Sequence, residues 1–133
     1  MEIRQQDHWL TDSLIAGEAI DVSTYDLVGR FKTDGKAYLC AADETPQFVL
    51  LESAAAGEPV SVAFFQSASG QAKVALSGTG SAGDKLSVGT GGTIVASGTS
   101  QAAEPDEDDI GVALADWTDG AETECFFVKG SKV

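Results

Sequence analysis

Asparagine is missing from this chain, and histidine, cysteine and cationic residues are scarce. Without Asn there is no acceptor for N-linked glycosylation. The single histidine, His8, cannot build a His-based metal centre, and no GxSxG motif accompanies it to suggest a serine hydrolase. With 8 Lys and Arg against 21 Asp and Glu, the formal net charge is -13. A charge of this sign repels phosphate backbones and anionic lipids, so we expect no nucleic-acid partner and no membrane partner.

The two cysteines, Cys40 and Cys125, stand far apart and outside any CxxC motif. This spacing excludes a metal knuckle and a thioredoxin-like site, and we interpret them as two small half-buried thiols, with a single disulfide as the alternative. Long hydrophobic runs are also missing: residues 48–51 and 60–65 are far shorter than the ~20 residues that cross a bilayer. Residues 1–7 lack the basic start and apolar stretch of a secretory signal, so no export signal is expected there.

What the chain does contain is a series of short apolar or alternating runs separated by turn residues at intervals of about ten. Its 133 residues fit one domain, and its 15 glycines are typical of turn-rich β structure. The sequence therefore predicts an all-β fold, either a compact β-clip-like domain or a small β-barrel or sandwich. The predicted strands are residues 27–33, 37–40, 47–51, 59–65, 72–76, 85–88, 93–96, 110–114 and 122–128.

The first 24 residues differ from the rest, because their apolar side chains show neither period 2 nor period 3.6. We predict an extended N-terminal arm over residues 1–24 and a β-rich domain over residues 25–133. Two tryptophans stand in otherwise polar surroundings. Trp9 either packs the arm onto its own domain or anchors it in a partner, and tryptophan is enriched among residues that dominate interfaces. Trp117 either caps the core or lies in a subunit contact.

Three motifs suggest chemistry and are better explained without it. Residues 78–83 spell GxGxxG, but a dinucleotide site needs a helix to follow, and the glycines at 89, 91 and 92 prevent one. Lys85 after a glycine turn resembles the modified lysine of lipoyl and biotinyl carriers, with a plain surface lysine as the simpler interpretation. The acidic run 106–109 lacks the glycine of a calcium loop, so it is interpreted as solvated, with loose cation binding as the alternative. We expect no catalytic residues, no metal site and no cofactor.

Five glycine-rich segments together resemble the capsid decoration proteins of tailed bacteriophages, also called cement proteins. They are residues 29–32 (GRFK), 46–52 (PQFVLLE), 56–63 (AGEPVSVA), 82–88 (AGDKLSV) and 110–114 (IGVAL). The likeness runs from about residue 25 to about residue 128 and omits the arm.

The resemblance implies a non-enzymatic protein, made in the host cytoplasm and located on the outer surface of the virion capsid. Its partner would be the major capsid protein, its assembly a homotrimer, and residues 25–133 the decoration domain. Bound to the assembled shell, it would stabilise the capsid by bridging neighbouring capsid subunits. We expect the arm to make the contact, through its apolar residues Ile3, Trp9, Leu10, Leu14 and Ile15, while Trp117 is a candidate for the subunit interface.

Two other classes stay open on the sequence alone. The first is another virion accessory module of a fibre, baseplate or tail, which would bind a neighbouring protein or a glycan. The second is a carrier or enzyme accessory domain modified at Lys85.

Overall fold

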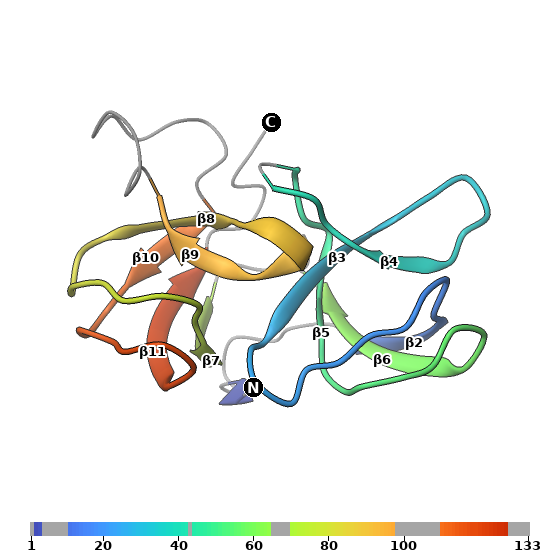
Figure 1. The fold of residues 1–133 in the computed structure, drawn as a ribbon, viewed down its shortest axis with the longest axis horizontal. Coiled ribbons are helices and arrows are strands. Elements are labelled where there is room, and N and C mark those ends of the chain that lie inside the picture. The colour runs from blue at the N-terminus through green and yellow to red at the C-terminus, as the bar shows by residue number, and fades with distance from the viewer. Residues whose placement is uncertain (1, 4–10, 43, 65–69, 98–109, 128–133) are drawn as a thin grey trace.

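A computed structural model of the chain describes residues 2–3, 11–42, 44–64, 70–97 and 110–127. Within these ranges the regular structure is eleven strands in two antiparallel sheets, together with one 3₁₀ turn, η3 (Thr90–Gly92). The sheets lie side by side, one in each half of the molecule (Figure 1). The prediction of an all-β fold is confirmed.

The five-stranded sheet is built from residues 11–64 in the order β2-β6-β5-β3-β4. Its strands are β2 (Thr11–Ile15), β3 (Leu27–Phe31), β4 (Ala37–Leu39), β5 (Phe48–Leu50) and β6 (Pro59–Phe64). The sheet curls, because Ala16 bridges Ala37 and the Gly17 N–H donates to the Ala37 carbonyl at 2.8 Å. The two edge strands therefore meet at one end, and the sheet forms half of a barrel.

The six-stranded sheet has the order β1-β7-β11-β10-β8-β9. Its strands are β1 (Glu2–Ile3), β7 (Gly70–Ala75), β8 (Lys85–Val88), β9 (Ile94–Ala96), β10 (Gly111–Ala113) and β11 (Glu122–Phe127). Only β1 comes from the N-terminal half of the chain, and it pairs with the outer edge of β7.

Both faces of the five-stranded sheet are buried, and the alternation within β5 shows how. Phe48 and Leu50 face the inside of the curl, whereas Val49 faces the six-stranded sheet, and all three are fully buried. Each such side chain contributes about 1.5 to 3 kcal/mol when it leaves water. The five-stranded sheet therefore packs against one core on each face. This explains why nearly every residue of a strand such as β5 is apolar.

A tight turn at Asp34-Gly35 joins β3 to β4. Gly35 has a φ of 76°, a left-handed conformation that glycine adopts without strain, and its N–H donates to the Lys32 carbonyl at 2.9 Å. The Asp34 carboxylate accepts a hydrogen bond from the Lys36 N–H at 3.0 Å and another from the Tyr38 hydroxyl at 2.6 Å. The side chain of one turn residue thus fixes the hairpin.

The predicted arm needs a correction over residues 11–24. Thr11–Ile15 form β2, which pairs with β6 along its whole length, and the next residues bury Ala16 and Ile20 in the curled core. The spacing of apolar residues does not reveal this strand. A short strand at the edge of a sheet buries few side chains, so its sequence shows little alternation. This part of the segment belongs to the domain. Residues 4–10 lie outside the described residues.

Candidate functional site

Five apolar residues near the N-terminus are predicted to contact a capsid, and the structure separates them. Ile3 lies in β1, where its backbone pairs with Ala72. Trp9 and Leu10 lie outside the described residues. Leu14 is half-buried and packs against the curled core, whereas the next residue, Ile15, is 43% exposed. Ile15 is therefore the described side chain of this set that a partner can reach.

A second apolar surface lies on the outer face of the six-stranded sheet. Ala113, Cys125 and Phe127 point into the core, so their chain neighbours point away from it. Leu114 and Phe126 are 43% and 38% exposed. Val112, which is half-buried, stands directly opposite Phe126 across β10 and β11. We call Val112, Leu114 and Phe126 the outer patch.

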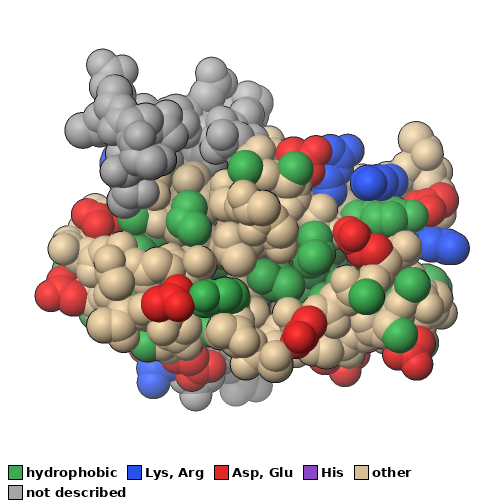
Figure 2. All heavy atoms as spheres, in the orientation of Figure 1, with side chains coloured by type: hydrophobic (Ala, Val, Ile, Leu, Met, Phe, Trp, Pro, Cys, Tyr) green, Lys and Arg blue, Asp and Glu red, His purple; other side chains and the backbone are tan. Residues whose placement is uncertain are grey.

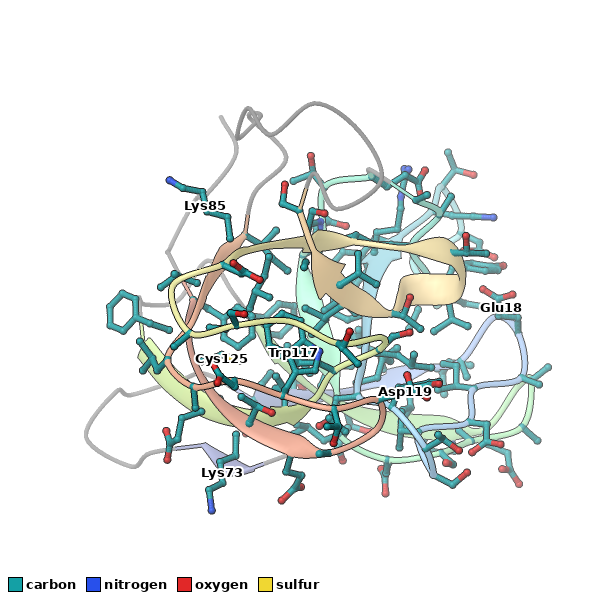
Figure 3. All side chains as sticks on the ribbon, turned by 60° about the vertical axis from the view of Figure 1, so that its left-hand side comes forward. Glu18, Lys73, Lys85, Trp117, Asp119 and Cys125 are labelled. Atoms are coloured by element: carbon teal, nitrogen blue, oxygen red, sulfur yellow. The ribbon has the colours of Figure 1, made fainter. Side chains whose placement is uncertain are left out.

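Charged residues border the outer patch. Lys85 stands opposite Val112 on β8, and Lys73 stands opposite Glu124 between β7 and β11. Both lysines project away from the body of the molecule (Figure 3). An apolar centre with a charged rim is the composition of a protein interface, where aromatic residues supply much of the affinity. No sequence motif marks these residues, although alternation along residues 122–127 turns the Phe126 side chain to the face opposite that of Cys125 and Phe127.

Trp117 caps the core, which is the first of its two predicted roles. Only 4% of its surface is exposed, and Figure 3 shows its indole inside the body. The backbone N–H of Trp117 donates to the Gly80 carbonyl at 3.0 Å, and the indole ring occupies the space that a Gly80 side chain would need. Its indole nitrogen has no hydrogen-bond acceptor among the described residues. Packing therefore holds Trp117, and it leaves little surface for a partner subunit.

The GxGxxG loop of residues 78–83 is closed by the protein's own carboxylates. β8 follows it, so it lacks the helix of a dinucleotide site. Asp119, Asp84 and Asp116 accept hydrogen bonds from the N–H groups of Gly78, Ser81 and Ala82 at 2.7, 2.9 and 2.8 Å. These are the kind of backbone donors that would otherwise hold a phosphate. Their occupation by negative groups argues against a nucleotide there.

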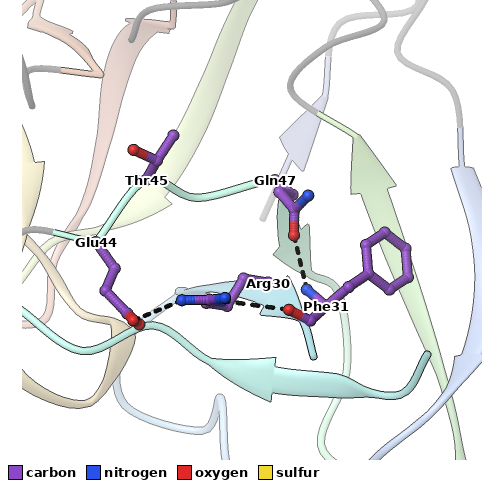
Figure 4. A pocket seen from close by; sticks show the side chains of 5 residues that line it. All are labelled: Arg30, Phe31, Glu44, Thr45 and Gln47. Atoms are coloured by element: carbon purple, nitrogen blue, oxygen red, sulfur yellow. Dashed lines mark hydrogen bonds and ion pairs between the residues drawn. The ribbon is translucent and has the colours of Figure 1, made fainter. Parts of the chain in front are cut away.

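The structure brings together a polar pocket that the sequence analysis did not identify. It is an open cavity of about 350 Å³, lined by Arg30, Phe31, Glu44, Thr45 and Gln47. We call it the Arg30 pocket (Figure 4). Arg30 Nη1 lies 2.6 Å from Glu44 Oε2, and the other Glu44 oxygen accepts the Ala41 N–H at 2.7 Å. The hydrogen bond from the Ala41 N–H is the main interaction that lowers the pKa of the Glu44 carboxyl. The hydrogen bond and the charge of Arg30 lower this pKa further.

Cys40 and Cys125 are both free and buried, so the disulfide alternative is not realised and the thiols are more deeply buried than predicted. Desolvation by the surrounding core raises the pKa of each thiol to about 12. Neither thiol is a nucleophile near neutral pH, because the reactive form is the thiolate.

The remaining predictions concern Lys85, metal binding, membrane spans and the acidic run. Lys85 begins β8 and is exposed. Across the described ranges, no three His, Cys, Asp or Glu residues gather in a way that would hold a metal ion. The same part of the chain contains no helix with the length and apolar character to span a membrane. The acidic run 106–109 lies outside the described residues.

Comparison with solved structures shows a likeness of fold. No family model matches the chain, and no curated protein matches it. Among solved structures, the chain is similar to the N base of the head fiber gp8.5 in bacteriophage phi29, with a TM-score of 0.66 and 19% sequence identity. The match covers 94% of this chain and 98% of that one. At this identity the likeness is one of fold, and it extends over nearly the whole of both chains.

Proposed function

We propose that the chain is a structural component of a tailed-phage head, which binds the outer surface of the assembled capsid. The observation that carries the proposal is the fold, which resembles the base of a phage head fiber over 94% of the chain. The decoration-protein motifs of the sequence point to the same location by a separate route. In this proposal the partner is the major capsid protein, the protein is a homotrimer, and it performs no catalysis and needs no cofactor.

Two described surfaces suit the contact with the capsid. The outer patch offers an aromatic ring and two aliphatic side chains on a rigid sheet, and Ile15 offers a separate apolar point on β2. Burying the outer patch would remove apolar surface from water at about 25 cal/mol per Å². Ile3, Trp9 and Leu10 remain predicted contacts of the N-terminal segment.

Stabilisation of the shell follows from binding to more than one capsid subunit. A ligand that binds only the assembled state shifts the equilibrium toward it, since its binding energy is lost when the subunits separate. In a trimer, release of one contact leaves the other two at high effective concentration. Contacts that are individually weak then persist.

Co-sedimentation with capsids tests the proposal. Heads assembled from the major capsid protein of the same phage are mixed with purified protein and pelleted. We expect the wild type in the pellet, together with heads that resist a higher temperature. The double variant L114S/F126S is expected to stay in the supernatant, whereas A55S, the same kind of change at an exposed loop residue, is expected to pellet like the wild type.

If wild-type protein stays in the supernatant with both immature and mature heads, the proposed capsid binding is wrong. If I15S and not L114S/F126S abolishes pelleting, capsid binding stands and the contact moves to β2.

A further inference from the structure

The Arg30 pocket is used by none of the roles described above. It opens beside the β3–β4 hairpin, at a distance from the outer patch on the other sheet. Its two charged side chains are accessible, with 39% of Arg30 and 34% of Glu44 exposed. A partner can therefore reach the pocket without any opening of the core.

The side-chain oxygens of Glu44 and Gln47 that line the pocket already accept hydrogen bonds from the protein itself. Both oxygens of Glu44 are occupied, one by Arg30 and the other by the Ala41 N–H. The Gln47 side-chain oxygen accepts the Phe31 N–H at 2.7 Å. Because that donor is a backbone N–H, the orientation of the Gln47 amide is fixed, and its NH₂ group faces the other way.

The groups that remain are donors. Within the described residues, no acceptor is assigned to Nη2 of Arg30 or to the NH₂ group of Gln47. Figure 4 shows the Gln47 nitrogen directed away from its bond to Phe31 and on the side opposite to Thr45. Thr45 is exposed and adds a hydroxyl. A pocket with filled acceptors and free donors favours a ligand that accepts hydrogen bonds.

The local charge has the sign that such a ligand needs. In a chain of net charge -13, residues 27–39 of the β3–β4 hairpin hold three cations, Arg30, Lys32 and Lys36, against the single carboxylate of Asp34, while Glu44 pairs with Arg30. Figure 2 shows Lys and Arg side chains gathered at this end of the molecule. Lys32 and Lys36 are exposed and extend the positive region beyond the pocket itself, so it suits an extended chain of negative groups better than one small anion.

The aromatic residue of the pocket does not offer a surface for a sugar. The Phe31 ring stacks on Phe64 with centroids 6.2 Å apart and meets Phe48 at 75° and 5.2 Å. In Figure 4 this ring points away from Arg30 and Glu44. Its faces are used inside the protein, whereas a saccharide site needs an aromatic face exposed to the ligand.

We propose that the Arg30 pocket binds the carboxylates of an acidic segment of a protein partner, with Arg30 Nη2, the Gln47 amide and the Thr45 hydroxyl as donors. If the proposed capsid binding holds, this partner segment belongs to the capsid, and to that extent the inference rests on the proposed function. A guanidinium nitrogen that donates to a carboxylate forms a charge-assisted hydrogen bond, which is stronger than one between neutral groups.

Titration of the isolated full chain by NMR tests the pocket without any capsid. The probe is a hexaglutamate peptide, compared with hexaglutamine, hexagalacturonate and sodium sulfate at equal ionic strength. We expect hexaglutamate to shift the backbone amides of Arg30, Phe31 and Gln47, and hexaglutamine to shift none of them. Shifts confined to other residues, equal shifts with sulfate, or tighter binding of hexagalacturonate would each overturn the proposal.

Q47E is the sharpest variant, because the glutamate keeps an acceptor for the Phe31 N–H and replaces the free donor by a negative oxygen. We expect Q47E and R30Q each to weaken hexaglutamate binding about tenfold, with K85Q as the matched control for loss of one exposed cation. The variants' own spectra confirm that they fold. Wild-type affinity in Q47E contradicts the proposal.

Pelleting with heads separates this inference from the proposed function. If wild-type protein binds hexaglutamate but not heads, the pocket stands and the capsid role fails. If heads bind Q47E and wild type equally, the capsid role stands and the pocket is not its docking site.

Discussion

Gly80 illustrates how a missing side chain determines local structure in this protein. The Trp117 ring lies where a Gly80 Cβ would be, and the two residues pair through their backbones. The loop of residues 78–83 can therefore close over the end of the six-stranded sheet. Gly78 and Gly83 adopt positive φ angles in turns, and Gly80 leaves room for the Trp117 ring. The GxGxxG pattern is therefore explained by turns and packing, without a bound phosphate.

Replacing Gly80 by alanine should destabilise the protein. The new Cβ overlaps the indole, so Trp117 must move out of its packed position, at a cost of about 1 to 3 kcal/mol in the free energy of unfolding. Urea unfolding followed by tryptophan fluorescence measures this loss. S81A, at the exposed neighbouring residue, should change stability by less than about 0.5 kcal/mol. A G80A protein as stable as the wild type would show that Trp117 is not packed there.

The buried thiols give a second prediction at this scale. Since burial raises the pKa of Cys40 and Cys125 to about 12, the folded state holds these protons to higher pH than the unfolded state, whose thiols titrate near 8.5. This contribution to stability is complete below about pH 8.5 and is lost as the pH rises toward 12.

We therefore expect Cys40 and Cys125 to resist a thiol reagent such as DTNB at about pH 8 in the folded protein. Both should react rapidly after unfolding in guanidinium chloride, which serves as the control. Rapid reaction of one thiol in the native protein would place it outside the core.

At the scale of elements, β2 shows how neighbouring residues on one strand separate stability from binding. Leu14 packs against the curled core, and Ile15 on the other side of the strand is 43% exposed. L14A should lower the free energy of unfolding by about 1 to 2 kcal/mol, whereas I15A should change it by less than about 0.5 kcal/mol. Thermal unfolding of the two matched variants measures the difference. Equal losses would contradict the placement of β2.

Deletion of residues 1–15 extends this prediction to the whole strand. It removes β2 from the edge of β6, uncovers Val60 and Val62, and also removes β1 from β7. We expect the truncated protein to lose cooperative unfolding or to aggregate, as uncovered sheet edges promote. A stable, soluble truncation would instead favour the arm that the sequence analysis predicts.

The sequence predicts most elements because each strand is a local pattern bounded by turns. Residues 85–88 form a strand with the predicted bounds, and the other predicted strands from residue 27 onward are confirmed to within two residues at each end. β1 and β2 escape prediction, because two- and five-residue edge strands are defined by partners about 50 or more residues away rather than by their own pattern.

The candidate sites depend more strongly on distant contacts. Alternation alone turns Phe126 away from the core, but its neighbourhood with Val112 and Leu114 requires the pairing of β10 with β11. In the Arg30 pocket, an ion pair connects Arg30 with Glu44, 14 positions away, and no sequence motif predicts this pair. The order of residues along a strand thus determines which side chains share a face, and tertiary structure is needed to bring the residues of a site together.

At the scale of the whole molecule, the dominant feature is unbalanced charge. A net charge of -13 on 133 residues makes the folded state repel itself, and the segment 101–125 adds nine acidic residues without a Lys or Arg. Repulsion of this kind opposes the association of copies of the chain at high concentration. It also makes the basic β3–β4 hairpin an exception that an acidic partner can recognise.

Salt should therefore stabilise the protein. Raising NaCl from about 10 mM to about 100 mM shortens the screening length from about 30 Å to about 10 Å, which weakens repulsion across the molecule. We expect the midpoint of thermal unfolding to rise by about 2 to 5 °C. Sucrose at equal osmolality is the control for effects unrelated to charge. An unchanged or lower midpoint in NaCl would mean that self-repulsion does not limit stability.

Attachment to a phage head is the central proposal, and the fold likeness over 94% of the chain is the observation that supports it. Electron cryomicroscopy of virions purified from cells that express this chain tests that proposal most directly. The account predicts density for its two-sheet body on the outer surface of the head, seated across more than one capsid subunit. Virions without the protein, or with it confined to the tail, would contradict the account.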